Sequence, residues 1–283
     1  RSTLFPYTTL FRSPAGLAAL MTAAIAVAAL AGCGAPNKQD SKSEVKNDSK
    51  TFVIGVDDTF PPMGFRNKKN QIVGFDIDMA REAAKRMNLK FKVQAINWDT
   101  KEMELKNDKI DAIWNGLSIT DERKKAMDFT KPYLENDQVI VVKKDSGIKT
   151  KADLAGKTVG CQKGSSAEDA LMDDAVGKKI KGGQATEFDE NVSAFEDLNA
   201  GRIDAMVVDS VVARYYIAKH KSDFKVLGES LSPEQYGVAV KKGNTQMRDA
   251  IQRALDDMKK DGTAAKISKK WFGQDIIYNW TAK

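Results

Sequence analysis

Two charged side chains occupy positions from which they could bind a small molecule that carries charged groups. Arg123 falls in the first turn of a helix that Thr120 can cap, directly after the segment LSIT. A guanidinium matches a carboxylate through two parallel hydrogen bonds, and a helix start adds N–H groups that favour anions. Helical side chains lean toward the N-terminus of their helix, which brings Arg123 beside Ser118. Taken alone, however, an arginine in the run DERKK favours a solvated charged face.

Asp209 is the corresponding candidate for binding a positive charge such as an ammonium group. It closes the apolar run AMVV, where a charged residue is unusual unless it is paired. Asp209 could also cap the helix that begins in VVARYY, and the two roles can coexist.

Metal, cofactor and nucleic-acid sites are not indicated. The only histidine, His220 in AKHKSD, is expected to be exposed, and no Cys/His cluster exists. The net charge is +6, but lysines usually stand beside acids and no basic block with interleaved aromatic residues occurs. Cys161, between TVG and QKG, is expected at a strand end as a small buried hydrophobe without a disulfide, rather than as a reactive thiol.

The N-terminal region has the pattern of an exported lipoprotein. The apolar run at 17–30 has 14 residues, whereas a membrane-spanning helix needs about 20. A short apolar run followed by small residues predicts a secretory signal peptide, here 14–33. Its end, LAGC, resembles the lipobox of bacterial lipoproteins, in which Cys33 would carry the lipid. The alternative is a buried Ala-rich helix that ends at a chance cysteine.

Two further N-terminal segments are set apart from the fold. Residues 1–13 lack an initiating Met and repeat TLF, so we interpret them as an assembly or cloning artefact that replaces the natural start. Residues 34–51 are polar, with charges of both signs, and predict a disordered tether. A flexible tether of this length would reach about 25 Å from a membrane anchor.

The remaining chain alternates strand and helix patterns, which predicts an α/β fold with mainly parallel sheets. Its length suits two modest cores. Asp76 and Asp78 offer caps for a helix that runs to Met87. Strands are expected at 52–56, 91–96, 110–114, 138–142, 158–160, 205–209 and 236–240. Further helices are expected at 101–106, after Thr120, and at 166–172, 191–199, 211–219, 245–260 and 263–271.

Two similar units, KNDKIDAIWNGLSIT and NAGRIDAMVVDSVVA, predict where a ligand would bind. Each contains a helix end, a turn, I-D-A, an apolar strand and a polar strand end. Ligands of open α/β sheets bind beyond the carboxyl ends of the strands. Asn115 and Ser118 stand at one of these ends and Asp209 at the other. Two lobes with facing strand ends would form a cleft between them.

These motifs resemble the polar amino-acid-binding proteins of ATP-binding-cassette (ABC) importers, which are bacterial extracellular solute-binding proteins of family 3. The resemblance covers about 51–273 and rests on IGVDDTFPPMGF, VGFDIDMAREAAKRM, IDAIWNGLSITDERKKAMDFTKPY, DLAGKTVG, KGSSAED, AGRIDAMVVD and DGTAAKISKKWFG. It implies the type II periplasmic binding fold, with two lobes and an inter-lobe cleft. Lobe 1 would comprise 52–140 and 236–283 and lobe 2 141–235, with hinge strands near 139–143 and 235–238.

The resemblance also implies the roles of the site residues. Arg123 would bind the carboxylate of a free amino acid, and Asp209 its ammonium group. The second lobe would add hydroxyl and N–H groups from the loop Gly164, Ser165 and Ser166. Asp57 and Gln162 match positions near the ligand side chain, although Asp57 could merely cap a turn. The remaining expected ligand-binding positions are the aromatic walls Phe60 and Trp98 and the cleft-lining Asn115, Gly116 and Ser118; Phe60 could equally belong to the core, as we expect for Trp114 and Trp271.

The function implied is capture of an amino acid and its delivery to an ABC transporter permease. The protein would be a non-enzymatic monomer without cofactor or metal, lipid-anchored on the extracytoplasmic face of the cell membrane. Glutamine, arginine and cystine remain open as ligands. A cyclohexadienyl-dehydratase-like enzyme on the same fold is the alternative, but it needs a positioned general acid, and no acid beyond Asp57 and Asp209 is evident. A sensor domain or fused hydrolase is not expected, because only ten residues follow Gly273.

Overall fold

The structure, a computed structural model, describes residues 50–219 and 223–278. The predicted signal peptide, Cys33, almost all of the tether and His220 lie outside the described residues, as does the segment 1–13. The described residues belong to one compact unit, Asn47–Lys283. No helix among them is both long and apolar enough to span a membrane.

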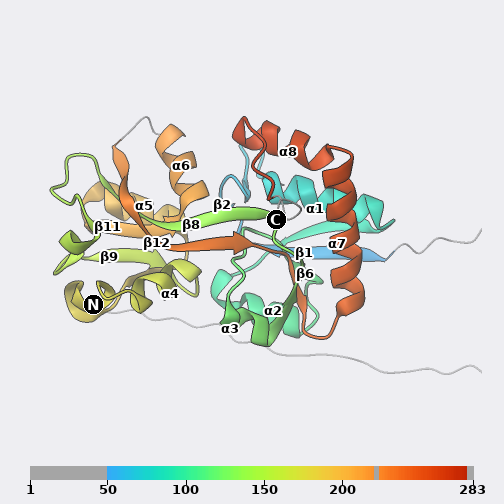
Figure 1. Cartoon of the computed structure of the whole chain (residues 1–283), viewed down its shortest axis with the longest axis horizontal. Helices are drawn as coiled ribbons and strands as arrows, with labels where there is room; N and C mark the ends of the chain where they lie inside the picture. The colour runs from blue at the N-terminus through green and yellow to red at the C-terminus, as the bar shows by residue number, and fades with distance from the viewer. Residues whose placement is uncertain (1–49, 220–222, 279–283) are drawn as a thin grey trace, which may run out of the picture. The chain divides into compact units, whose positions relative to one another are not determined.

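The first five-stranded sheet has the order β5-β1-β6-β13-β7. Its strands are β1 (Thr51–Val56), β5 (Lys90–Ala95), β6 (Ala112–Ile113), β7 (Met127–Phe129) and β13 (Ala239–Lys241). β1 pairs in parallel with β5 and β6, whereas β13 is antiparallel to β6 and β7. The accompanying helices are α1 (Phe75–Arg86), α2 (Lys101–Lys106), α3 (Asp121–Ala126), α7 (Thr245–Lys260) and α8 (Thr263–Phe272) (Figure 1).

The second five-stranded sheet has the order β10-β9-β11-β8-β12. Its strands are β8 (Leu134–Lys143), β9 (Val159–Gln162), β10 (Thr186–Phe188), β11 (Ala205–Asp209) and β12 (Phe224–Tyr236), with helices α4 (Ser166–Asp173), α5 (Asn191–Ala200) and α6 (Ser210–Lys219). β9 is parallel to β10 and β11. A three-stranded antiparallel sheet is formed by β2 (Thr59–Phe60), β3 (Gly64–Arg66) and β4 (Ile72–Val73). Short 3-10 helices occupy Trp98–Thr100, Lys151–Leu154, Gly177–Lys179 and Lys181–Gly183. The predicted α/β fold is confirmed, and each five-stranded sheet combines parallel pairs with antiparallel ones.

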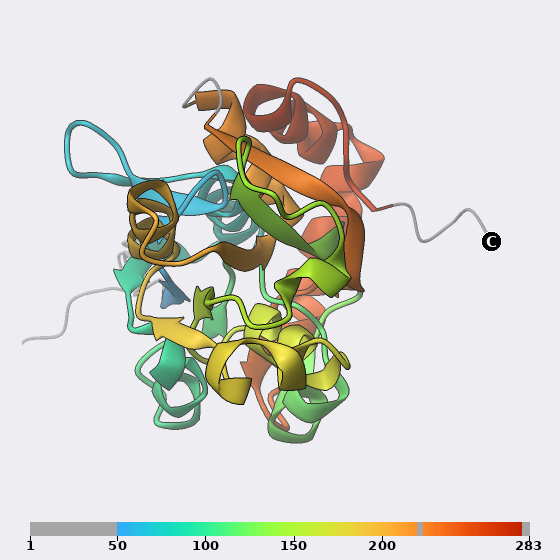
Figure 2. The ribbon, with the colours of Figure 1, turned by 90° about the vertical axis from the view of Figure 1, so that its left-hand side faces the viewer.

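Two long antiparallel strands connect the two large sheets. β8 and β12 pair from Leu134 opposite Tyr236 to Lys143 opposite Phe224, and they lie side by side in Figure 2. The second sheet therefore begins before residue 141, where the sequence places the start of lobe 2. The division into lobes stays a prediction. The strand predicted at 236–240 is in fact divided, because Tyr236 ends β12 and β13 begins only at Ala239, after the chain has passed from one sheet to the other.

The start of helix α1 differs from the prediction. Gly74 is the N-cap residue, no side chain caps the helix, and Asp76 is fully buried within the first turn. Gly74 has φ 152°, and a Cβ there would lie 2.1 Å from the carbonyl oxygen of Met63. The close approach of these two backbones requires glycine and determines where the helix begins. Thr120, by contrast, caps α3 as predicted, since its Oγ1 accepts from the N–H of Arg123 at 3.2 Å.

Three residues that the sequence predicts to be in the core pack there. Trp114 is fully buried, and Trp271 is half-buried against the same core. Cys161 is a buried free thiol on β9, as predicted, and burial raises its pKa. Apolar residues from β8, β9 and β11 pack around Cys161, so this thiol contributes to the core of the second sheet.

Candidate functional site

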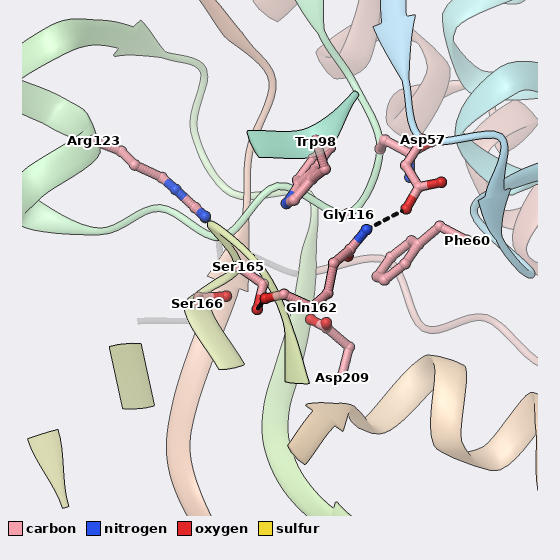
Figure 3. Close-up of a pocket in the computed structure, with 10 residues that line it drawn as sticks. Asp57, Phe60, Trp98, Gly116, Arg123, Gln162, Ser165, Ser166 and Asp209 are labelled. Atoms are coloured by element: carbon pink, nitrogen blue, oxygen red, sulfur yellow. Dashed lines mark hydrogen bonds between the residues drawn. The ribbon is translucent and has the colours of Figure 1, made fainter. Parts of the chain in front are cut away.

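One pocket gathers the predicted binding residues. It is lined by ten residues: Asp57, Phe60, Trp98, Asn115, Gly116, Arg123, Gln162, Ser165, Ser166 and Asp209 (Figure 3). All ten were predicted from the sequence. Ser118, the eleventh, is buried and is not among the lining residues.

The pocket forms where strands of both sheets end. Asp57 follows β1, Asn115 follows β6, and Gln162 and Asp209 are the last residues of β9 and β11. The carboxyl ends of parallel strands meet at the same edge of a sheet, which is where open α/β sheets bind ligands. The two similar sequence units thus deliver polar groups to one pocket from two sheets.

Arg123 is buried without an acidic partner. Its side chain is 7% exposed, and it reaches from α3 toward the loop of Ser165 and Ser166 (Figure 3). Nη1 donates to the carbonyl oxygen of Ser118 at 3.1 Å and Nη2 to that of Gly164 at 3.3 Å. Among the described residues, no carboxylate forms an ion pair with this guanidinium, and the nearby acids act on it only through longer-range charge: Glu102, Asp169, Glu234 and Asp209. Burial lowers the pKa of Arg123, since a buried unpaired charge is unfavourable. This end of the pocket therefore suits an anion.

Asp209 is buried among hydrogen-bond donors. Its Oδ1 accepts from Asn136 Nδ2 at 2.7 Å, Gln138 Nε2 at 2.9 Å and Tyr236 Oη at 2.6 Å. Burial first, and then the charge of Glu234, raise the pKa of Asp209 to about 7. These partners lie on β8 and β12, so the crossing strands orient this carboxylate toward the pocket.

Asp57 and Gln162 connect the two sheets. Gln162 Nε2 donates to Asp57 Oδ2 at 2.7 Å, which is the dashed line in Figure 3, and also to the carbonyl oxygen of Asp189 at 2.9 Å. Asp57 Oδ1 accepts from the N–H and the hydroxyl of Thr59 at 2.8 and 2.7 Å. Asp57 therefore stabilises a local turn and lines the pocket at the same time. Burial raises its pKa.

The apolar walls depend on a glycine. Phe60 and Trp98 are both less than 10% exposed and line the pocket. Gly116 has φ +60°, and a Cβ there would lie 2.8 Å from Cε1 of Phe60. Its N–H donates to Asp76 Oδ2 at 2.6 Å. Gly116 thus allows the Phe60 ring to approach the backbone after β6.

The loop of Gly164, Ser165 and Ser166 has hydrogen bonds of its own. The hydroxyl of Ser165 accepts from the N–H of Glu168 at 3.2 Å and donates to the carbonyl oxygen of Gln162 at 2.6 Å, so it caps α4. The N–H of Gly164 donates to Glu168 Oε2 at 2.8 Å. These two groups serve the loop itself, while the start of α4 still borders the pocket.

Asn115 is buried with no hydrogen-bond partner for either Oδ1 or Nδ2 within the described residues. Leaving a buried polar group unsatisfied costs about 1–3 kcal/mol. Asn115 lines the pocket, and its Oδ1 lies against Gly64, where an added Cβ would come within 2.3 Å of it.

Three charged residues of the site were missed by sequence reasoning. Lys101 is 2% exposed, and its Nζ donates to the carbonyl oxygens of Trp98 at 3.1 Å and Gly164 at 2.8 Å. Burial and the nearby charge of Arg123 lower the pKa of Lys101 to about 8. Asp76, expected as a cap, accepts from Gly116 and from Tyr133 Oη at 2.9 Å, and burial raises its pKa to about 7. Glu234 approaches Asp209 from β12.

No local signal distinguishes these three residues in the sequence. Lys101 stands in a charged run and Glu234 in the polar segment LSPEQ, both typical of solvated surfaces, and Asp76 stands where a helix cap is common. In the described part of the chain, no group of three or more His, Cys, Asp or Glu side chains could hold a metal ion.

Known proteins are similar to this chain over most of its length. The family described as "Bacterial extracellular solute-binding proteins, family 3" matches residues 52–274. The chain is 34% identical to the L-cystine-binding protein TcyJ of Escherichia coli (strain K12) over 89% of this chain and 94% of that protein. It is 36% identical to the ABC transporter arginine-binding protein 1 of the same strain, over 78% and 90% of the two chains. A substrate-binding protein of an ABC uptake transporter from Streptococcus pneumoniae, solved with bound histidine, superposes with a TM-score of 0.79 at 37% identity, covering 81% and 95%.

Proposed function

Because the chain belongs to the bacterial extracellular solute-binding proteins of family 3, we propose that it captures a free amino acid outside the cytoplasm and delivers it to the permease of an ABC importer. The similar proteins whose names state a ligand bind cystine, arginine, histidine or glutamine. Within the structure, the proposal rests above all on one observation: Arg123 is buried in the pocket without a carboxylate partner.

The two charged ends of the pocket match the two charges of an α-amino acid. Arg123 would bind the carboxylate in a bidentate manner, and Asp209 would accept hydrogen bonds from the ammonium group. Asn115 would gain a partner for its amide. A ligand held by groups from both sheets binds the closed arrangement better than an open one, and this difference drives closure.

The side-chain end of the ligand would face Asp57 and Gln162, between the aromatic walls Phe60 and Trp98. An acid and an amide favour a polar or positively charged side chain over an apolar one. Arginine, glutamine, histidine and cystine all fit this description.

A thermal-shift screen of residues 47–283 against the twenty amino acids and L-cystine tests the function. A ligand at 100 times its Kd adds about 2.7 kcal/mol to the stability of the folded protein, so a true ligand should raise the melting temperature clearly. Arg123→Ala is the matched control and should lose the response. If no amino acid stabilises the wild-type protein, the proposed function is wrong.

The protein acts as a receptor and not as an enzyme in this proposal. The dehydratase alternative would require one of the buried acids to transfer a proton to a bound substrate. Mass analysis after long incubation should therefore recover the bound amino acid unchanged. A converted product would favour the enzyme.

The lipid anchor at Cys33 is a separate part of the proposal and is supported by the segment LAGC after the apolar run. Cys33→Ser in the full chain should move the protein from the membrane fraction to the soluble fraction of the producing bacterium. Cys161→Ser, which removes the buried thiol, serves as the control and should leave the fractionation unchanged. An unaltered membrane fraction for Cys33→Ser would reject lipid anchoring.

A further inference from the structure

A buried lysine next to the pocket connects elements of the two large sheets. Lys101 is the first residue of α2, which accompanies the first sheet, and its side chain is 2% exposed. Its Nζ donates to the carbonyl oxygen of Gly164, in the loop after β9 of the second sheet, at 2.8 Å. It also donates to the carbonyl oxygen of Trp98, an aromatic wall of the pocket, at 3.1 Å. Lys101 itself is not among the lining residues.

The ammonium group of Lys101 uses all of its hydrogen-bonding capacity. A lysine ammonium has three donors. Two of them face the carbonyl oxygens of Gly164 and Trp98, and Glu102 Oε1 lies 3.2 Å from the same Nζ. The ammonium also lies 5.1 Å from the centre of the Trp98 ring, within the range of a cation–π contact. The position of Lys101 is therefore fixed from three sides.

The carbonyl oxygen of Gly164 accepts hydrogen bonds from two cations. Arg123 Nη2 donates to it at 3.3 Å, which is longer than the 2.8 Å contact from Lys101. A carbonyl oxygen has two lone pairs, so both bonds can form at once. Without Lys101, this carbonyl would lose the closer of its two donors and depend on Arg123.

This sharing affects how Arg123 can bind a ligand. A ligand carboxylate would compete with the Gly164 carbonyl for the N–H groups of Arg123. Gly164 is half-buried, and a carbonyl that is removed from water and has no partner is unfavourable. Because Lys101 keeps its own, shorter bond to Gly164, Arg123 Nη2 can turn to a ligand without leaving that carbonyl unpaired.

The charges of the two cations are also coupled. Burial first, and then the charge of Arg123, lower the pKa of Lys101 to about 8. The neighbouring acids Glu102 and Asp99 offset part of this effect. A carboxylate bound by Arg123 would offset more of it, so the buried charge of Lys101 and the binding of an anion favour each other.

A second contact between the same segments is exposed. Lys163 Nζ lies 3.3 Å from Asp99 Oδ2, and the two side chains are 47% and 41% exposed, so this ion pair contributes little. Gly164 has φ +66°, and a Cβ there would lie 3.1 Å from Asp99 Oδ1, which shows how closely the loop packs against the turn before Lys101. The position of the loop therefore depends more on the buried lysine than on the exposed pair.

We propose that Lys101 is a positioning residue of this site: it keeps the Gly164 carbonyl paired and the loop after β9 in place, so that Arg123 can turn its N–H groups to a ligand carboxylate. The inference rests on the proposed amino-acid binding. It goes beyond that function because it assigns a role in affinity to a lysine outside the pocket lining.

The first test measures affinity in Lys101→Met by calorimetric titration. The probe is whichever of L-arginine, L-glutamine and L-histidine stabilises the wild-type protein most. Methionine keeps an unbranched stem and removes the ammonium group, so the Gly164 carbonyl retains only Arg123 of its two cationic donors. Affinity should fall about tenfold, which corresponds to about 1.4 kcal/mol. Unchanged affinity in the folded variant would overturn the role of Lys101.

A double-mutant cycle distinguishes positioning of Arg123 from general structural support. In an Arg123→Ala background, Lys101→Met should reduce affinity much less than it does in the wild type, because no guanidinium is left to be released from Gly164. An equal fold-loss in both backgrounds would mean that Lys101 acts independently of Arg123, and the proposal would then be wrong.

Three further variants complete the comparison. Lys106→Met removes the same charge from the exposed last residue of α2 and should keep the wild-type affinity. Lys101→Arg keeps the charge and the ability to donate to Gly164, so it should retain more affinity than Lys101→Met. If Lys101→Met does not fold, Lys101→Gln takes its place in the cycle, with the same non-additivity expected and the same equal loss contradicting the proposal.

Failure of the inference is distinguishable from failure of the proposed function. If the wild type binds an amino acid and Lys101→Met binds it equally well, only the role of Lys101 is overturned. If no amino acid binds the wild type, the proposed function is wrong, and this inference with it.

Discussion

Arg123 and Asp209 are both buried and both charged, but the protein satisfies their charges in different ways. Arg123 donates to two backbone carbonyls and meets no carboxylate among the described residues. Asp209 accepts from three side chains and has Glu234 as an acidic neighbour. The proposed anion-binding end thus has no acidic partner in this structure, whereas the proposed cation-binding end is already organised by hydrogen bonds.

This difference has a consequence for affinity and stability. A ligand carboxylate would pair with a buried guanidinium that has no acidic partner. The Arg123 end of the pocket should therefore contribute most to affinity. The Asp209 end is part of a network that exists without ligand, so changes there should affect both binding and the empty protein.

The largest effect is expected for Arg123→Ala. Truncating one partner of a buried charge pair costs about 2–5 kcal/mol, so affinity for the amino acid should fall about 30-fold or more. The melting temperature of the empty protein should change little, because the variant removes a charge that has no partner. Calorimetric titration measures the first effect and a thermal scan the second. Lys124→Ala, on the exposed face of α3, is the control; near-wild-type affinity in Arg123→Ala would contradict the assignment.

Asp209→Asn should have the next largest effect. Affinity should fall about 30-fold, since the ligand ammonium would lose its charged partner. The asparagine can still accept hydrogen bonds from Gln138 and Tyr236 through its oxygen. The same titration with Asp204→Asn as control, an acid at the other end of β11, measures the effect. Wild-type affinity in Asp209→Asn would place the ammonium elsewhere.

The pH dependence should distinguish binding from stability. With a pKa of about 7 in the empty protein, Asp209 becomes protonated as pH falls, so affinity should drop about tenfold between pH 8 and pH 6. Stability of the empty protein should change in the opposite direction. A carboxyl whose folded-state pKa is raised above its unfolded value stabilises the folded state at low pH, and this contribution is lost as pH rises through about 7.

Asp76 also has a raised pKa of about 7, and it adds to the stability effect without contacting the ligand. Asp209→Asn isolates the binding part, since its affinity should be nearly independent of pH over the same range. An equal pH dependence of affinity in the wild type and Asp209→Asn would assign the titration to another group.

Asn115→Ala should have a smaller effect. The ligand would lose hydrogen bonds to one neutral amide, which corresponds to about 1 kcal/mol or roughly fivefold in affinity. The empty protein should be no less stable, because the variant removes two buried groups that have no partner. A clear fall in the melting temperature of the empty variant would mean that Asn115 is satisfied before the ligand binds.

The smallest effect on affinity is expected for Trp98→Phe, which keeps an aromatic wall. Ligand should alter the intrinsic fluorescence of the wild type, and Trp98→Phe should remove most of that change, because Trp98 lines the pocket. Trp271→Phe, at a position that packs against Asp78 and outside the pocket lining, should respond as the wild type does. A full fluorescence change in Trp98→Phe would mean that another tryptophan responds to the ligand.

Local patterns were sufficient for most of the lining. Asp57, Asn115, Gln162 and Asp209 stand just after or at the ends of apolar strands, and the carboxyl ends of neighbouring parallel strands must meet at one edge. Thr120 was recognisable as a cap from its place before acidic residues. The assignment of these residues to one pocket came from the family resemblance and not from periodicity.

The sequence by itself determined the α/β order, the strand ends and the candidate pair Arg123 and Asp209. Strand and helix patterns depend on residues that are close together in the sequence, so they can be recognised without the tertiary structure. Only the tertiary structure decided which charges are buried. Lys101 Nζ donates to the carbonyl oxygen of Gly164, and Glu234 accepts a hydrogen bond from the hydroxyl of Ser118, a residue 116 positions away. Burial and hydrogen-bond direction depend on atoms that distant segments bring together, so a residue in a surface-like run carries no local sign of them.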